Sequence, residues 1–169
     1  MQLPEFRYHP DPQATGAVAA SDKQCRRCGE AHGFIYTGPV YAVEELDGCL
    51  CPWCIADGSA AEEFAAEFTD VGWGVPSDVP EAVLQEVSTR TPGFSGWQQE
   101  HWLYHCCDAA AFLGRVGWAE LQLYPDAIES LQTEHDVDYV IALDVDGEAT
   151  AYLFRCRHCD RHIAYADSA

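Results

Sequence analysis

Apolar residues recur at helical spacing in two segments of the chain. In Ala60–Phe68 (AAEEFAAEF), Phe64 and Phe68 stand four residues apart and would share one helical face. Asp108–Gly114 (DAAAFLG) is rich in alanine, a strong helix former. We therefore expect helices over both segments.

A third helix is predicted from residue 81 to 89. Val79, Val83 and Val87 form an apolar stripe at helical spacing, which indicates a face turned toward a core. Asp78 is a suitable N-cap, and Pro80 stands near the expected first turn.

Runs rich in β-formers predict two hairpins. Gly33–Val43 has two such arms separated by Gly38-Pro39. Further along, Tyr139–Val145 and Ala149–Phe154 are joined by Asp146-Gly147, a dipeptide that favours a two-residue hairpin turn. Helical and strand patterns thus occur in both halves of the chain, which indicates an α+β fold.

The composition is that of a globular protein. Hydrophobic residues make up 48% of the 169 residues, which excludes general disorder. Trp97, Trp102, Trp118 and Tyr124 are expected in the core. We find no repeat and no linker, so one domain over residues 1–169 is expected. No apolar run reaches the roughly 20 residues of a membrane span, and the N-terminal segment lacks the apolar core of a signal peptide. A cytoplasmic protein without a membrane partner is the expectation.

Acidic residues dominate the charge. There are 28 of them against 9 basic residues, a formal net charge of −19. No Lys or Arg occurs between Arg27 and Arg90, or between Arg115 and Arg155. Such a surface repels phosphate backbones, which argues against direct nucleic-acid binding, and it would attract a basic protein. We expect the second stretch, from Glu120 to Glu148, to supply the contact face.

Two C-x2-C pairs in the first half predict a zinc site. Cys25 and Cys28 are followed by Cys51 and Cys54, and each pair can sit on a tight knuckle that directs two thiolates at one ion. The order of knuckle, hairpin, second pair and helix is that of a treble-clef zinc finger, here over residues 25–70. A thioredoxin-type redox role for Cys51-Pro-Trp-Cys54 is disfavoured, because that motif has no upstream partner pair.

A further C-x2-C pair, Cys156 and Cys159, needs two more ligands to hold a second zinc. Cys106 is the first choice, and the fourth ligand is His105, His101 or Cys107. The second module, over residues 97–166, would then contain the parts of the first in permuted order, with helix-start ligands before a hairpin and a zinc knuckle. Both modules would share one core. The alternative is that some of these cysteines are buried free thiols.

Catalytic motifs are absent or incomplete. His101 and His105 are four residues apart, but the metalloprotease pattern needs Glu after the first His, where this chain has Trp102. The zinc deaminase pattern, the P-loop and the dinucleotide fingerprint are also missing. A non-enzymatic protein is therefore favoured, and a metal-dependent enzyme using the 101–106 segment stays open.

Several motifs resemble those of the CbrC family, and the likeness extends over nearly the whole chain. They are LPEFRYHPDPQATG at residues 3–16, YTGPVY at 36–41, CPWCIADGSA at 51–60, FTD at 68–70, RTPGF at 90–94, WQQ at 97–99 and FRCRHC at 154–159. The family has a small residue at the position of Cys107, which is where this chain departs from it.

This resemblance implies a function. The family takes its name from a protein linked to tolerance of a DNase colicin, and relatives occur as immunity proteins beside toxins. A DNA-cleaving toxin needs a basic surface, which an acidic protein can cover. The expectation is thus a zinc-binding immunity protein whose partner is a nuclease toxin. A regulatory module for another basic partner is the other alternative to an enzyme.

Overall fold

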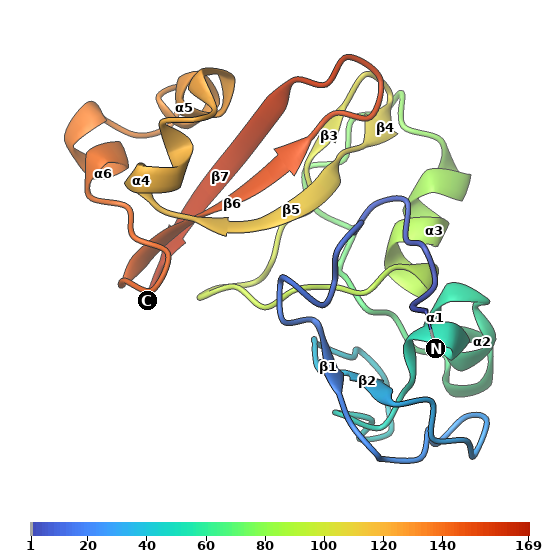
Figure 1. The fold of residues 1–169 in the computed structure, drawn as a ribbon. Coiled ribbons are helices and arrows are strands. Elements are labelled where there is room, and N and C mark those ends of the chain that lie inside the picture. Colours follow the sequence, from blue (N-terminus) through green and yellow to red (C-terminus); the bar gives the residue numbers. More distant parts are fainter. Residues whose placement is uncertain (1) are drawn as a thin grey trace.

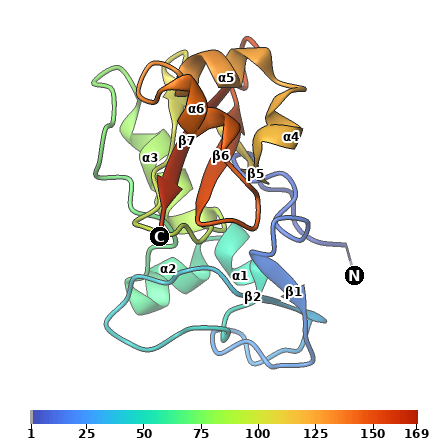
Figure 2. The same ribbon diagram turned by 90° about the vertical axis from the view of Figure 1, so that its left-hand side faces the viewer.

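A computed structural model describes residues 2–169 as a mixed α+β fold (Figures 1 and 2). The N-terminal half holds β1 (Val18–Ala20), β2 (Phe34–Tyr36), α1 (Pro52–Ala56), α2 (Ser59–Phe64) and α3 (Glu81–Arg90). The C-terminal half holds β3 (Tyr104–His105), β4 (Asp108–Ala109), β5 (Ala111–Val116), α4 (Trp118–Leu121), α5 (Pro125–Leu131), α6 (Val137–Ile141), β6 (Ala149–Arg155) and β7 (His162–Ser168).

The main sheet is antiparallel, with the strand order β5-β6-β7. The central strand β6 alternates between two cores, because successive side chains of a strand point to opposite faces. Ala151 and Leu153 pack with the residues of α4, α5 and α6, which cover one face of the sheet (Figure 1). Tyr152 and Phe154 belong to an aromatic cluster on the other face. The sheet is therefore buried on both sides along its central strand.

The aromatic cluster joins distant parts of the chain. Phe94 stacks on Phe112 with ring centroids 3.9 Å apart, and Trp102 meets Phe154 edge-on at 5.6 Å. Tyr8, from the N-terminal segment, and Val87, from α3, complete the buried set. Helix α3, the segment that follows it and the N-terminal segment are thus tied to the main sheet.

A separate apolar cluster stabilises the N-terminal half. It packs β1, β2, α1 and α2 together, around Tyr36, Leu50, Ile55 and Phe68. In Figure 2 these elements lie together below the main sheet. Three of the nine cysteines belong to this cluster.

Some predicted elements are confirmed. The helix at 81–89 is α3, and the strand at 149–154 lies within β6. Val79 and Val87 of the predicted apolar stripe are buried. Asp78 is not the N-cap, however: Pro80 occupies that position, and no side chain caps α3. The helix expected at 60–68 is shorter, since α2 ends at Phe64 and Ala65 adopts a left-handed conformation.

Three other predictions are wrong. The hairpin at 33–43 does not form, because β2 pairs with β1, and Tyr41 instead forms a bridge with Glu67. The first residues of the predicted strand at 139–145 belong instead to helix α6, which ends at Ile141. The predicted helix at 108–114 consists of strands β4 and β5.

Three of the four aromatic residues expected in the core are at least partly buried. Trp102 is buried, and Trp118 and Tyr124 are partly buried against the helical layer, whereas Trp97 is exposed. Within residues 2–169, no helix combines the length and the apolar character that crossing a bilayer requires.

Candidate metal centres

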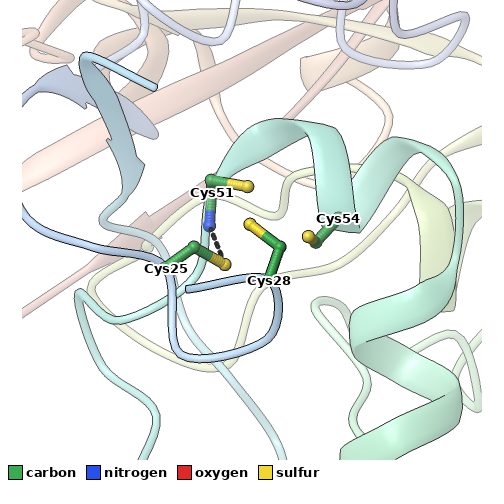
Figure 3. Close-up of side chains that lie close together, drawn as sticks. All are labelled: Cys25, Cys28, Cys51 and Cys54. Carbon is green, nitrogen blue, oxygen red and sulfur yellow. Dashed lines mark hydrogen bonds between the residues drawn. The ribbon is translucent and has the colours of Figure 1, made fainter. Parts of the chain in front are cut away.

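Four cysteines from two separate loops meet beside the N-terminal apolar cluster. The sulfur atoms of Cys25, Cys28, Cys51 and Cys54 all lie within 4.8 Å of one another. Figure 3 shows them converging, two from the loop after β1 and two from the start of α1. Cys25, Cys51 and Cys54 are 1%, 1% and 5% exposed, and only Cys28 reaches the surface.

Local backbone geometry sets these thiols in place. The N–H of Gly29 donates to the carbonyl of Cys25 at 2.7 Å, and the N–H of Cys25 donates to the carbonyl of Glu30 at 2.9 Å. The turn requires a left-handed residue after its second cysteine, and Gly29, at φ 75°, supplies it. Cys51 is the N-cap of α1, with Pro52 in the first turn.

The thiols interact strongly with one another. The pKa of Cys25 is lowered to about 4, first by the hydrogen bond that it accepts from the Cys51 thiol, against the effect of burial. The backbone N–H of Cys51 also donates to this sulfur, at 3.3 Å. The pKa of Cys51 is correspondingly raised, and burial raises the pKa of Cys54 to about 11. A bound cation would supply the charge needed for all four thiols to ionise together.

A second group of four ligands joins two β-turns. His105 and Cys106 come from the turn between β3 and β4, and Cys156 and Cys159 from the turn between β6 and β7. The ligand atoms again lie within 4.8 Å of one another. The sulfur of Cys106 is 3.8 Å from that of Cys159 and 3.2 Å from Nδ1 of His105.

The two C-x2-C turns share one backbone geometry. The N–H of Cys156 donates to the carbonyl of Arg161 at 2.8 Å, which repeats the bond from Cys25 to Glu30. Asp160, at φ 58°, takes the left-handed position that Gly29 takes in the first turn. The second C-x2-C pair, expected to form a knuckle, therefore adopts the same backbone turn as the first.

Asp108 connects the two turns of the second group. Its Oδ2 accepts hydrogen bonds from Arg157 at 2.7 Å and from Nε2 of His158 at 2.8 Å, and both donors lie inside the C-x2-C turn. Its Oδ1 accepts from the Tyr8 hydroxyl at 2.8 Å. Burial alone would raise the pKa of Asp108, but these hydrogen bonds and the charge of Arg157 lower it. This carboxylate therefore holds the knuckle against the β3–β4 hairpin.

The thiols of the second group also have shifted pKa values. Burial alone would raise the pKa of Cys156, but the backbone N–H groups of His158 and Cys159 outweigh it and lower the value to about 6. Hydrogen bonds to the thiols of Cys156 and Cys159 raise the pKa of Cys106 to about 11. As in the first group, the pKa of one thiol is lowered and that of a neighbouring thiol is raised.

Of the three residues considered for the fourth position, His105 lies with the cysteines. Cys107 points elsewhere, and its sulfur is 3.1 Å from Oδ2 of Asp78. His101 lies between Trp73 and Tyr165, with ring centroids at 5.1 and 5.3 Å. The ligands expected at a helix start come instead from a hairpin, because residues 104–109 form β3 and β4.

Sequence reasoning missed Asp108 and Tyr8. The two side chains are bonded across 100 positions of the chain, and no local pattern reports such a pair. The only signal was the position of Asp108 directly after the adjacent cysteines.

Both groups fit a tetrahedral metal ion of the zinc type. All nine cysteines are free thiols, so no disulfide competes for these positions. Four thiolates, or three thiolates and an imidazole, are common structural zinc sets, and bonds of about 2.3 Å place sulfur atoms about 3.8 Å apart. The 3.8 Å between Cys106 and Cys159 agrees with that spacing. The molecule therefore has two four-ligand groups that could hold metal ions.

The chain belongs to the family described as "Uncharacterised protein family (UPF0167)", whose model matches residues 3–168. It is 54% identical to the UPF0167 proteins of Mycobacterium bovis and Mycobacterium tuberculosis over 177 residues, covering 99% of this chain and 95% of each of those proteins. A UPF0167 protein of Pseudomonas aeruginosa is 43% identical over 168 residues, covering 93% of this chain and 92% of that protein. No solved structure matches the chain.

Proposed function

We propose that this protein is a zinc-stabilised, non-enzymatic inhibitor that binds a basic nuclease toxin and covers its DNA-binding surface. The observation that carries the proposal is the combination of two complete four-ligand groups with a net charge of −19. A catalytic zinc keeps one coordination position open for water or substrate, whereas four protein ligands close the coordination shell. Each ion would thus support the fold and leave recognition to the surface.

The first group is proposed as a treble-clef-like zinc site. Its knuckle and its helix-start pair support this interpretation, while the strand that accompanies them is paired with β1. The second group is proposed as a zinc site between two β-turns. A cytoplasmic location is part of the proposal, because reducing conditions keep thiols available for metal.

One acidic surface of the molecule lies on the layer formed by α4, α5 and α6. Most carboxylates between Glu120 and Glu148 are exposed there or on the loop that follows; these are Glu120, Glu129, Glu134, Asp136, Asp138, Asp144, Asp146 and Glu148. A face of this kind attracts a basic protein over long range and raises the association rate, an effect that added salt weakens. We propose this layer as the contact face for the toxin.

The CbrC-like motifs support the choice of partner. They suggest a tolerance or immunity role against a DNA-cleaving toxin. The names of the UPF0167 relatives state no activity. The rival hypotheses, a metal-dependent enzyme at the 101–106 segment and a regulatory module with another basic partner, are outcomes of the test below.

The test is protection of cells that express a nuclease toxin encoded beside this gene. The wild type should protect and should form a stable complex with the toxin. Cys51→Ser should not protect, because loss of the first metal site would unfold the N-terminal half. Protection by an unfolded Cys51→Ser protein would contradict the structural role of the metal.

A second variant tests the contact face. Asp146→Lys with Glu148→Lys should slow association and weaken its salt dependence while the fold is retained, since both side chains are exposed. Asp136 belongs to the same acidic stretch but is not reversed in this variant, because its side chain caps α6. A wild-type protein that binds no nuclease but turns over a substrate would replace the inhibitor hypothesis with the enzyme.

A further inference from the structure

An open pocket of about 460 Å³ lies at β7, the edge strand of the main sheet, beside the segment that leads into β3. Its walls come from the loop after residue 72, the segment leading into β3, strand β7 and the turn that follows α5. The residues that line it are Trp73, Gly74, Pro76, His101, Trp102, Leu103, Tyr104, Glu134, Tyr165 and Ala166.

Aromatic rings dominate this pocket. Trp73 is 73% exposed, although a large apolar side chain is normally covered. Its ring lies beside that of His101, at 5.1 Å, and His101 in turn stacks on Tyr165 at 5.3 Å with an angle of 25° between the planes. Tyr165 stacks in turn on the buried ring of Tyr152, with ring centroids 4.8 Å apart. The exposed tryptophan is thus the outer end of a stack anchored in the aromatic core.

Glu134 is the one acidic side chain in the lining, and no Lys or Arg among the described residues lines the pocket. Glu100 lies next to His101 in the chain, outside the lining. Glu100 is only 5% exposed. Its Oε1 accepts a hydrogen bond of 2.6 Å from the Tyr41 hydroxyl, which is an uncharged donor. Burial raises the pKa of Tyr165, and the charges of Asp167 and Glu100 act in the same direction.

The Tyr104 ring is also part of the lining. Its hydroxyl is closed to solvent and makes no hydrogen bond within the described part of the chain, so recognition falls to the ring faces and to the Glu134 carboxylate. Aromatic faces and a carboxylate together suit a flat organic cation.

We propose that this pocket binds the side chain of an arginine presented by the basic partner. Arginine fits better than lysine, because its planar guanidinium can stack on aromatic rings while its N–H groups reach the Glu134 carboxylate. This inference rests on the proposed function, in that it supplies a specific anchor beside the acidic layer, with which the pocket shares Glu134.

The pocket can be tested without the toxin. Titrations of the metal-loaded protein with Ac-Gly-Arg-Gly-NH2 should shift the indole signal of Trp73 in NMR spectra. The matched peptide with citrulline has the same shape without the charge and should bind at least about tenfold more weakly. The lysine peptide should fall between the two. Equal binding of the arginine and citrulline peptides would overturn the proposal, as would free arginine binding more tightly than the peptide, which indicates a small-molecule site.

Paired variants locate the effect. Trp73→Ala and Glu134→Gln should each weaken binding of the arginine peptide about fivefold or more. Trp97→Ala and Glu148→Gln are the controls, since both residues are exposed and lie outside the pocket lining, and they should change nothing. A loss of binding in the controls equal to that in the pocket variants would overturn the proposal.

The toxin assay separates this inference from the proposed function. If Trp73→Ala protects cells as well as the wild type and the peptide does not bind, the inhibitor function stands and the arginine pocket is wrong. If the peptide binds as described but no nuclease forms a complex, the pocket stands and its basic partner is a different protein.

Discussion

At the scale of single residues, the β3–β4 turn gives two adjacent cysteines different surroundings. Cys106 and Cys107 both have positive φ, 53° and 59°, as a tight two-residue hairpin turn requires. Their side chains therefore diverge. The Cys106 sulfur lies 3.8 Å from that of Cys159, whereas the Cys107 sulfur lies beside Asp78.

Adjacent substitutions should consequently have different effects on metal content. Cys106→Ser should reduce the bound zinc from two equivalents to about one, because three remaining ligands hold the ion less tightly. Cys107→Ser should keep both equivalents. Elemental analysis of the two purified proteins checks this. Loss of zinc from the Cys107 variant alone would reassign the fourth ligand.

His9 is a second residue whose surroundings predict a measurable effect. It is fully buried between the carbonyl of Pro92, at 2.7 Å from Nδ1, and the hydroxyl of Thr15, at 2.7 Å from Nε2. Desolvation lowers its pKa from 6.5 to about 4. The fold thus keeps the ring neutral, with the proton on Nδ1 donated to Pro92.

Stability should therefore fall as the medium becomes acidic. The contribution of His9 is complete above pH 6.5 and declines below it, because the unfolded chain gains a proton that the folded chain binds only near pH 4. Between pH 7.5 and pH 5 the loss should be about 2 kcal/mol. Denaturant unfolding gives the free energies of unfolding of the wild type and of His9→Gln. The difference between these two free energies should become smaller from pH 7.5 to pH 5. A constant difference would mean that His9 has the same pKa in the folded and the unfolded chain.

At the scale of elements, packing outweighed local propensity in two segments. The alanine-rich run at 108–114 predicts a helix, yet it forms β4 and β5. Ala109 and Ala110 are fully buried there, because their small side chains fit against the aromatic cluster. The β-branched run after Asp136 reads as a strand. It begins as α6 because Asp136 caps it and Val140 enters the core beneath the helical layer.

The cap of α6 gives a prediction at this scale. Oδ1 of Asp136 accepts a hydrogen bond from the N–H of Tyr139 at 2.8 Å. Asp136→Ala should destabilise the protein by about 1 kcal/mol, which corresponds to a fall in Tm of about 2–4 °C. Asp138→Ala, two residues further on and equally exposed, is the control and should shift Tm by less. Equal shifts would show that general charge, not the cap, stabilises this helix.

At the scale of the whole molecule, the two cysteine groups differ in how far sequence alone could define them. The first group was predictable as a set, since two C-x2-C pairs already supply four ligands. The second was not, because its ligands come from turns about fifty residues apart and three residues competed for the last position. Only the β3–β4 pairing, which places Cys106 at a turn and directs Cys107 away, separates these alternatives.

The two groups also differ in what their metal would support. Three of the four thiols in the first group are buried within the apolar cluster that packs β1, β2, α1 and α2. In the second group, Cys106 and Cys159 are exposed, and the hydrogen bonds of Asp108 already join the two turns. Removing the first ion would leave buried thiolates without a counter-charge, whereas the second ion can leave through a local opening.

Zinc should therefore leave in two phases. With a competing chelator, one equivalent should be released at least about tenfold faster than the other, because the exposed site needs only a local opening. The fast phase should leave far-ultraviolet circular dichroism nearly unchanged, and the slow phase should coincide with its loss. Cys106→Ser should lack the fast phase, while Cys107→Ser should keep both. A single phase in the wild type, accompanied throughout by loss of structure, would mean that the two metals support one cooperative unit.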